Sequence, residues 1–261
     1  MRIIDRLAKR ARLSTGRLTS ARRALPDFMI IGAQRAGTTS LYSYLAQHRM
    51  VVSAMQKEIH YFDASFHRGL SWYRAHFPLA SALKERSSPT RSITGEATPN
   101  YLFDPLAAER AASVVPDAKL IVLLRNPVER AHSHWRHTVR AGYEDLAFEE
   151  AILQEESRND PHYAYLARGL YASQLEHWMA RFDSKQLLVL RSEDLFAEPQ
   201  PILDRLAAFL DIPAWTPDDL RPRYSAKGRS LDASTRVDLV KYFGEPNQRL
   251  HELLGRDMEW D

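Results

Sequence analysis

The sequence contains no cysteine among its 261 residues. Disulfide frameworks, zinc fingers, iron–sulfur clusters and cysteine nucleophiles are therefore excluded. It also has no run that approaches the roughly 18 apolar residues of a membrane-spanning helix. The N-terminus lacks the long apolar core of a secretory signal. We therefore expect a cytoplasmic protein, although a chain without cysteine is compatible with any redox compartment.

The composition is that of a soluble globular protein with a sizeable core. Hydrophobic residues make up 44% of the chain and charged residues 26%, both ordinary values for such proteins. The length fits one large domain with an added arm. We predict a basic N-terminal arm over residues 1–26 and a single domain over residues 27–261.

The positive charge of the chain is concentrated in the arm. Residues 1–23 contain eight lysines and arginines against Asp5 alone, a net charge of +7, whereas the whole chain carries only +3. Apolar residues recur there at helical spacing, at Ile3, Ile4, Leu7 and Ala11. This pattern is compatible with a basic amphipathic helix that contacts an anionic membrane or a partner. The favoured alternative is a solubilising arm that is frayed or docked on the domain. We expect no nucleic-acid partner.

After Pro26 the chain reads as alternating strands and helices. Apolar runs predict strands at 27–31, 120–124 and 186–190. Helical periodicity predicts helices at 38–47, 126–141, 202–210, 237–243 and 248–254, the last two separated by a turn at 244–246. Residues 80–95 and 211–232 are predicted to be long loops. Such alternation predicts a three-layer α/β fold, P-loop-like, with a central parallel sheet flanked by helices.

A phosphate-binding loop is predicted between the first strand and the first helix. Gly32 and Gly37 lie five residues apart, as in nucleotide-binding P-loops, and Gly37 lets the backbone approach a phosphate. The start of the following helix directs N–H groups at an anion. Threonine stands at the usual position of the P-loop lysine, and a cation lies three residues earlier. The predicted donor-binding set is Arg35, Ala36, Gly37, Thr38, Thr39 and Ser40.

A second anion-binding motif begins at the end of the strongest predicted strand. Arg125 lies at the carboxyl end of that strand, where ligands bind in open α/β sheets, and Ser133 lies on the following helix. Together they could clamp a second phosphate. Arginine stands where a P-loop kinase has the acidic residue that helps to hold Mg²⁺. A phosphosulfate donor without a metal therefore fits better than ATP.

Three histidines on one predicted helix could in principle hold a metal ion. His134 and His137 are three residues apart, and His132 is close by. No cysteine or acidic residue completes this set on the helix, so we predict no metal.

Seven stretches of the chain carry a resemblance to a known family. They are IGAQRAGTTSL (31–41), KEIHYFD (57–63), GEATPNYLF (95–103), LIVLLRNPVERAHSHW (120–135), RGLYASQLEHW (168–178), AKGRSL (226–231) and EPNQRLHELLGRDMEW (245–260). In the same order, they resemble the sulfotransferases that use 3′-phosphoadenosine-5′-phosphosulfate (PAPS), specifically the branch with the heparan sulfate N- and 3-O-sulfotransferase domains and bacterial relatives. The resemblance covers nearly all of residues 27–260. It implies PAPS as the donor, its desulfated form PAP as the product, and no metal.

The resemblance also implies roles for individual residues. The loop at 35–40 would hold the 5′-phosphosulfate, and Arg125 and Ser133 would contact the 3′-phosphate. Glu58 matches the proposed catalytic base of the family. The late loop that closes over the donor corresponds to Lys227, Gly228 and Arg229.

Sulfuryl transfer needs a proton acceptor and a cation. By analogy with phosphoryl transfer it is an in-line displacement in which positioning and charge stabilisation dominate. A carboxylate such as Glu58 can take the proton of the acceptor hydroxyl, and Arg35 and Lys57 can stabilise the charge of the departing phosphate. His60 could orient the acceptor or act as the base, and a purely structural role is an equal alternative.

The acceptor side departs from the heparan-type enzymes. Arg35 replaces the lysine usual in the family, and Ala97 replaces a lysine on the acceptor side. We therefore expect an acceptor less anionic than heparan, namely a hydroxyl or amine of a glycan, glycolipid or small molecule. Trp135 is mainly a core candidate and could also form a stacking wall. The predicted acceptor-binding set is Lys57, His60, Glu96, Thr98, Pro99 and Trp135.

Two other functions compete with this reading. One is a P-loop kinase of a small metabolite, which Thr38 and Arg125 disfavour. The other is a non-catalytic nucleotide-binding protein that kept the fold, which the intact Glu58 disfavours.

Overall fold

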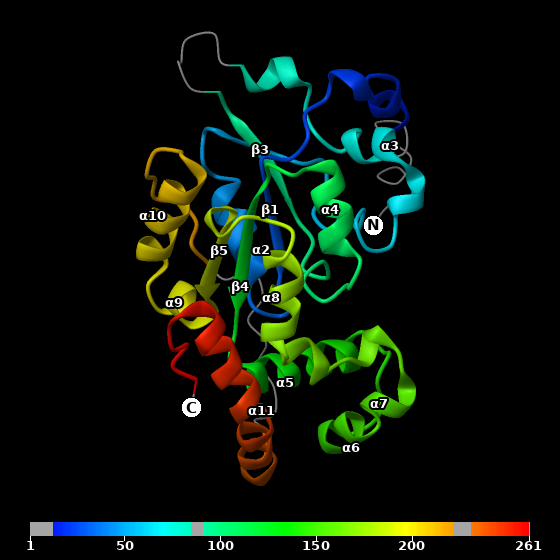
Figure 1. Cartoon of the computed structure of the whole chain (residues 1–261), viewed down its shortest axis with the longest axis vertical. Coiled ribbons are helices and arrows are strands. Elements are labelled where there is room, and N and C mark those ends of the chain that lie inside the picture. The colour runs from blue at the N-terminus through cyan, green and yellow to red at the C-terminus, as the bar shows by residue number, and fades with distance from the viewer. Residues whose placement is uncertain (1–12, 85–90, 222–230, 261) are drawn as a thin grey trace.

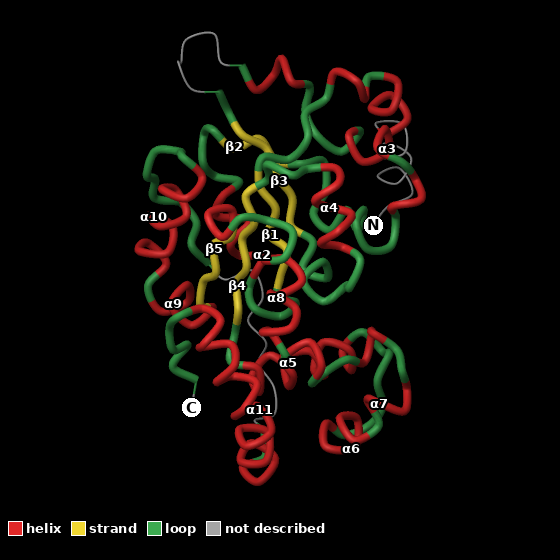
Figure 2. Tube along the Cα trace, in the orientation of Figure 1, coloured by secondary structure: helices red, strands yellow, loops and turns green. Residues whose placement is uncertain are grey.

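The computed structural model describes residues 13–84, 91–221 and 231–260 of the chain. Its centre is a five-stranded sheet with the order β2-β3-β1-β4-β5, in which every pair of neighbouring strands is parallel. The strands are β1 (Phe28–Gly32), β2 (Val51–Ser53), β3 (Ile93–Ala97), β4 (Lys119–Leu124) and β5 (Leu187–Arg191). Helices lie on either side of the sheet (Figure 2). The prediction of a three-layer α/β fold is confirmed.

The helices of the described residues are mostly short. They are α2 (Thr38–Leu45), α3 (Leu70–Arg74), α4 (Ala107–Val114), α5 (Pro127–Arg140), α6 (Phe148–Leu153), α7 (Glu155–Arg158), α8 (Tyr171–Met179), α9 (Ser192–Ala197), α10 (Pro199–Leu210) and α11 (Ala233–Leu254). Helices α5, α6, α7 and α11 gather beyond the end of β4 (Figure 1). That end of the molecule is where ligands of parallel sheets bind.

The two longest apolar strands form the middle of the core. Every residue of β1 is buried, and β4 is buried from Leu120 onward. Strands that are covered on both faces need such continuous apolar runs. The helix after β4 begins as predicted, because the side chain of Asn126 accepts hydrogen bonds from the N–H groups of Val128 and Glu129.

Two short strands and one long helix differ from the predictions. β2 and β3 were not predicted, because β2 has three residues and β3 contains threonine, glycine and glutamate. The two helices predicted near the C-terminus are one helix, α11, with Pro246 inside it. Leu239, Phe243 and Leu250 are buried along this helix, and it contacts both α5 and α8. Burial of this apolar face outweighs the backbone hydrogen bond that proline removes.

The strand order reverses beside β1. β3 lies on one side of β1 and β4 on the other, so the chain crosses the sheet after β3. In open α/β sheets the ligand site lies at such a reversal, outside the carboxyl ends of the strands. The loops that follow β1, β3 and β4 are therefore brought together at one edge.

The described part of the basic arm is docked on the domain. The N–H of Ala24 donates to the carbonyl of Pro78 at 3.0 Å, and Nη1 of Arg23 donates to the carbonyl of Phe77 at 2.5 Å. Residues 1–12, which carry much of the arm's charge, lie outside the described residues. In the part of the chain that the structure describes, no helix has the length and apolar character to cross a membrane.

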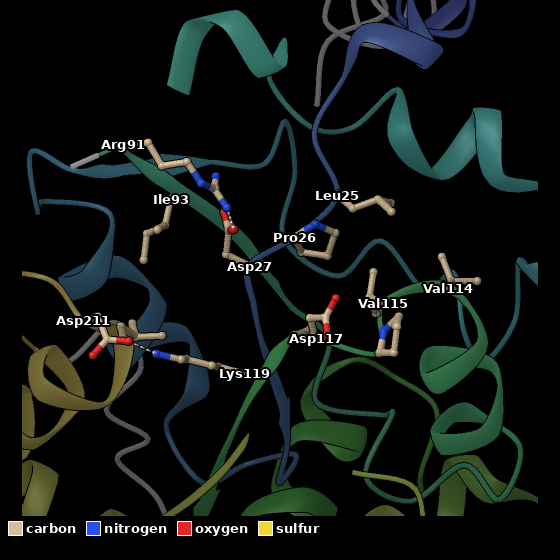
Figure 3. A pocket seen from close by; sticks show the side chains of 13 residues that line it. Leu25, Pro26, Asp27, Arg91, Ile93, Val114, Val115, Asp117, Lys119 and Asp211 are labelled. Carbon is tan, nitrogen blue, oxygen red and sulfur yellow. Dashed lines mark hydrogen bonds and ion pairs between the residues drawn. The ribbon is translucent and has the colours of Figure 1, made fainter. Parts of the chain in front are cut away.

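A cavity of about 610 Å³ lies at the opposite edge of the sheet, near the amino ends of β1, β3 and β4. Ion pairs between Asp27 and Arg91 and between Lys119 and Asp211 cross its lining (Figure 3). These charges neutralise one another, and the cavity is remote from the carboxyl ends of the strands. It is therefore separate from the predicted donor site.

Candidate active site

The loop after β1 is shaped to bring backbone close to a bound group. Gly37 precedes α2 with a left-handed φ of 99°. A Cβ atom at this position would lie 2.7 Å from Cζ of Phe196, so glycine is needed for both space and conformation. The hydroxyl of Ser192 donates to the carbonyl of Ala36 at 2.6 Å. The start of α9 thus holds the loop in place.

The two predicted anion-binding motifs meet at the carboxyl edge of the sheet. Nε of Arg35 donates to Oγ of Ser133 at 3.3 Å, across 98 residues of sequence. Nη1 of Arg125 donates to the carbonyl oxygen of Arg35 at 3.3 Å. The phosphate loop, the end of β4 and the face of α5 therefore converge on one small region with two guanidinium groups.

Residues that were not predicted support Arg125. The hydroxyl of Tyr171 donates to the carbonyl of Arg125 at 2.8 Å. The N–H of Asn126 donates to Oε1 of Glu193 at 2.9 Å, and Oε2 of Glu129 lies 3.7 Å from Nη2 of Arg125. Tyr171 lies in the stretch 168–178 that carried the resemblance, and this is the one signal that could have identified it.

Glu58 lies beside the carboxyl end of β3. Its N–H donates to the carbonyl of Ala97 at 2.9 Å. Its carboxylate forms an ion pair with Lys57, and Nε2 of His60 lies 3.9 Å from Oε2 of the same carboxylate. Half of the Glu58 side chain is exposed, at 49%. A carboxylate, an amine and an imidazole are thus placed together where an acceptor can reach them.

The imidazole of His60 is held from its other side by a residue that was not predicted. Nδ1 of His60 and Oδ2 of Asp63 are 2.7 Å apart. This hydrogen bond raises the pKa of His60 above its ordinary value, and burial opposes the rise. Glu58, His60 and Asp63 therefore form a row that ends at the proposed base.

Three of the predicted catalytic residues have left-handed backbones. The φ angles are 71° for Arg35, 59° for Glu58 and 55° for His60. Such angles are uncommon for residues other than glycine and cost roughly 1–3 kcal/mol each. Residues with such backbone angles cluster at active sites. Their occurrence at these three positions therefore supports an active site formed by the loop that carries Arg35 and the loop that carries Glu58 and His60.

The predicted acceptor residues of the 96–99 turn lie below the surface. Glu96 and Thr98 are both 0% exposed, and Pro99 is also buried. The carboxylate of Glu96 accepts hydrogen bonds from Tyr73 at 2.6 Å, Thr98 at 2.7 Å and Tyr101 at 3.2 Å. The expectation that Glu96 and Thr98 line the acceptor cleft is therefore corrected: they form a polar layer beneath it.

Burial raises the pKa of Glu96 from 4.5 to about 7. The folded protein therefore holds this proton more tightly than the unfolded chain. Protonation of Glu96 therefore contributes to the free energy of unfolding. This contribution is fully present below pH 4.5 and is lost as the pH rises to about 7, which lowers the free energy of unfolding by about 3 kcal/mol. Glu96→Gln, which cannot ionise, is expected to remove this decline from the pH dependence of Tm.

Thermal unfolding measured as a function of pH tests this expectation. The control is Glu109→Gln, which changes a glutamate that is 72% exposed and should keep the decline. An undiminished decline in Glu96→Gln would assign the pH dependence to other groups.

Trp135, His132 and His134 belong to packed surroundings on α5, whereas His137 is exposed. Nε1 of Trp135 donates to the carbonyl of Leu146 at 3.0 Å, and its ring stacks on His132 with 5.5 Å between centroids. Trp135 is thus half-buried in a satellite core with Phe148. Among the described residues, no three histidine or acidic side chains are grouped as metal ligands. The predicted donor-loop residues Lys227, Gly228 and Arg229 lie outside the described part of the chain.

The chain matches known proteins over most of its length. Residues 25–226 match the family model described as sulfotransferase domain. The chain is 26% identical to the membrane-associated sulfotransferase kil1 of Dictyostelium discoideum, over 90% of this chain and 66% of that protein. It is 30% identical to bifunctional heparan sulfate N-deacetylase/N-sulfotransferase 4 of Mus musculus, over 89% of this chain.

The chain spans about two thirds of the first of these relatives and 30% of the second. Among solved structures, a sulfotransferase from Alicyclobacillus acidocaldarius has a TM-score of 0.76 at 29% identity. That comparison covers 90% of this chain and 97% of the other. The likeness therefore extends to the whole fold and not only to the phosphate loop.

Proposed function

Because this chain belongs to the sulfotransferase domain family, we propose that it transfers a sulfuryl group from PAPS to an acceptor and releases PAP. The acceptor group is a hydroxyl or an amine of a glycan, glycolipid or small molecule. Family membership does not favour the alternative of a P-loop kinase. The contacts among Arg35, Arg125 and Ser133 carry the proposal.

Those contacts suit a donor that has two anionic groups on one ribose. PAPS carries a phosphosulfate on its 5′ oxygen and a phosphate on its 3′ oxygen. Because both groups are attached to one ribose, the cationic side chains that bind them must lie close together. Arg35 and Arg125 meet this condition, because Nη1 of Arg125 reaches the Arg35 carbonyl and Ser133 reaches the Arg35 side chain. Arginine is suited to such sites because its planar fork pairs with phosphate oxygens in a bidentate manner. We assign the 5′-phosphosulfate to the loop at 35–40 and the 3′-phosphate to Arg125 and Ser133.

The transfer itself needs one bond made, one bond broken and one proton moved. The acceptor oxygen or nitrogen attacks sulfur, the bond from sulfur to the 5′-phosphate oxygen breaks, and the acceptor proton passes to Glu58. PAP leaves with the negative charge, which Arg35 stabilises. Lys57 forms an ion pair with the carboxylate of Glu58. His60 borders the same carboxylate and can orient the acceptor.

The position of Ala97 bears on the charge of the acceptor. Ala97, which stands where the resembling heparan-type enzymes have lysine, is 0% exposed. This supports an acceptor with fewer negative charges than heparan. For the arm at 1–23, with its charge of +7, we favour a solubilising role in a cytoplasmic protein, and peripheral contact with an anionic membrane is the alternative.

A donor and metal comparison tests the proposed function. Purified protein is incubated with labelled PAPS, a panel of glycans, glycolipids and small alcohols and amines, and a metal chelator. We expect a labelled product in at least one reaction with the chelator present, because the cations of the site belong to the protein. Turnover with ATP and Mg²⁺, together with none from PAPS, would replace the proposal with the kinase.

A further inference from the structure

The loop that carries Glu58 and His60 is tied to an arginine in the protein interior. Nδ2 of Asn100 donates to Oδ2 of Asp63 at 2.7 Å, and this same oxygen is bonded to His60. Nη2 of Arg168 donates to Oδ1 of Asn100 at 2.8 Å. A continuous row of side chains thus runs from Arg168 through Asn100 and Asp63 to His60, and His60 borders Glu58.

The amide of Asn100 can take only one orientation in this row. Its oxygen faces a guanidinium, which only donates, and its NH₂ group faces a carboxylate, which only accepts. A flipped amide would oppose donor to donor and acceptor to acceptor at both ends. The other oxygen of Asp63 accepts from the N–H of Ala64 at 2.7 Å, and the Asp63 side chain is only 3% exposed. The carboxylate is therefore fixed at both oxygens.

The interior end of the row is rigid and positively charged. Arg168 is 6% exposed and donates to the carbonyl of Pro161 from Nε at 3.3 Å and from Nη2 at 3.0 Å. Its guanidinium lies 4.2 Å from the centroid of the Phe103 ring. Burial lowers its pKa to about 9, so it remains a cation at neutral pH. This charge favours the ionised form of Asp63 across Asn100.

We propose that Arg168 and Asn100 are positioning residues for the transfer reaction. Together they hold the Asp63 carboxylate so that it orients the His60 imidazole toward Glu58. This inference rests on the proposed function, because it gives the row a task in proton transfer. Neither residue contacts the donor loop in the described structure, so their effect passes through His60.

A second tether separates this role from general support of the loop. Nη1 of Arg110, on α4, donates to the carbonyls of Phe62 at 2.7 Å and Asp63 at 2.8 Å. The backbone of the loop therefore keeps an anchor when the side chain of Asn100 is removed. Asn100→Ala should release the orientation of Asp63 and His60 while the loop stays in place.

The test is a double-mutant cycle on kcat. Asn100→Ala is expected to lower kcat about tenfold and to leave the KM for PAPS unchanged, because misoriented catalytic groups cost rate rather than donor affinity. In the His60→Ala variant, the additional substitution Asn100→Ala should lower kcat less than about twofold, because the imidazole that Asp63 orients is then absent. Arg168→Lys keeps the charge without the planar fork and should reproduce the tenfold loss.

The control is Gln174→Ala. The amide of Gln174 donates to the carbonyls of Ala167 at 3.1 Å and Leu170 at 3.0 Å. It supports the turn that carries Arg168 without bonding to Asn100. Its removal should lower stability and leave kcat unchanged. An equal loss of kcat from Asn100→Ala in both backgrounds, or no loss in either, would overturn the proposal.

A spectroscopic measurement keeps this test independent of the proposed function. The Nδ1–H proton of His60, bonded to Asp63, should give a downfield NMR resonance that disappears in Asn100→Ala and persists in Gln174→Ala. A resonance that is unaffected by Asn100→Ala would overturn the positioning role even in a protein with known activity. Absence of transfer from PAPS with every acceptor would instead overturn the proposed function and leave this measurement valid.

Discussion

Glu58→Gln is expected to lower kcat by about 10²–10⁴-fold, the usual contribution of a general base. The amide keeps the size and much of the hydrogen bonding of the carboxylate, yet it cannot accept the acceptor's proton. Its backbone bond to Ala97 and the left-handed φ of 59° do not depend on the charge. Affinity for PAP should therefore stay the same, because the donor is held by other residues.

Initial rates with saturating PAPS and isothermal titration with PAP measure the two quantities. Glu176→Gln is a matched control, since Glu176 is a half-exposed glutamate that is ion-paired with Arg249, away from the site. It should retain full activity. A Glu58→Gln enzyme with the wild-type kcat for its true acceptor would remove Glu58 from the role of base.

Arg125→Ala is expected to weaken binding of PAP by about 1.5–3 kcal/mol, the range for a hydrogen bond to a charged group. This corresponds to an increase in Kd of about 10- to 150-fold. The loss should be larger for PAP than for adenosine 5′-phosphate, which lacks the 3′-phosphate. Adenosine 5′-phosphate therefore serves as a ligand control within one variant.

The protein control for this change is Arg181→Ala. Arg181 is 52% exposed and its nearest acidic partner, Glu109, is 3.8 Å away. Its removal should leave the affinity for PAP unchanged. Equal weakening of PAP and adenosine 5′-phosphate by Arg125→Ala would place the Arg125 contact elsewhere on the nucleotide.

The residues proposed to bind the donor can be predicted from the sequence, because each lies in a short motif next to a predicted strand. Gly32 and Gly37 stand at a fixed spacing between a buried strand and a helix, and Arg125 follows five apolar residues. Strand ends of a parallel sheet meet at one edge, so two such motifs predict a shared site. The observed contact between Arg35 and Ser133 is what this reasoning expects.

The supporting half of the site leaves no signal in residue spacing or strand pattern, and only the resembling stretches 57–63, 95–103 and 168–178 contain its residues. Asp63, Asn100 and Arg168 come from three distant segments, and their meeting depends on the tertiary fold. Glu96 was placed on a turn because β3 has no apolar run, and its burial follows from the covering tyrosines. Residues of this kind become visible only when side chains of different segments are brought together.

The strand order has a consequence for how such proteins diversify. The proposed donor contacts come from the loops after β1 and β4, whereas Glu58 lies at the β3 side of the sheet. Substitutions of exposed side chains on the β3 side, such as Glu58, can thus leave the proposed donor contacts in place. The donor can therefore be kept while acceptor preference changes, and replacement of the chain segment between β1 and β4 would transfer the β3-side residues as a unit.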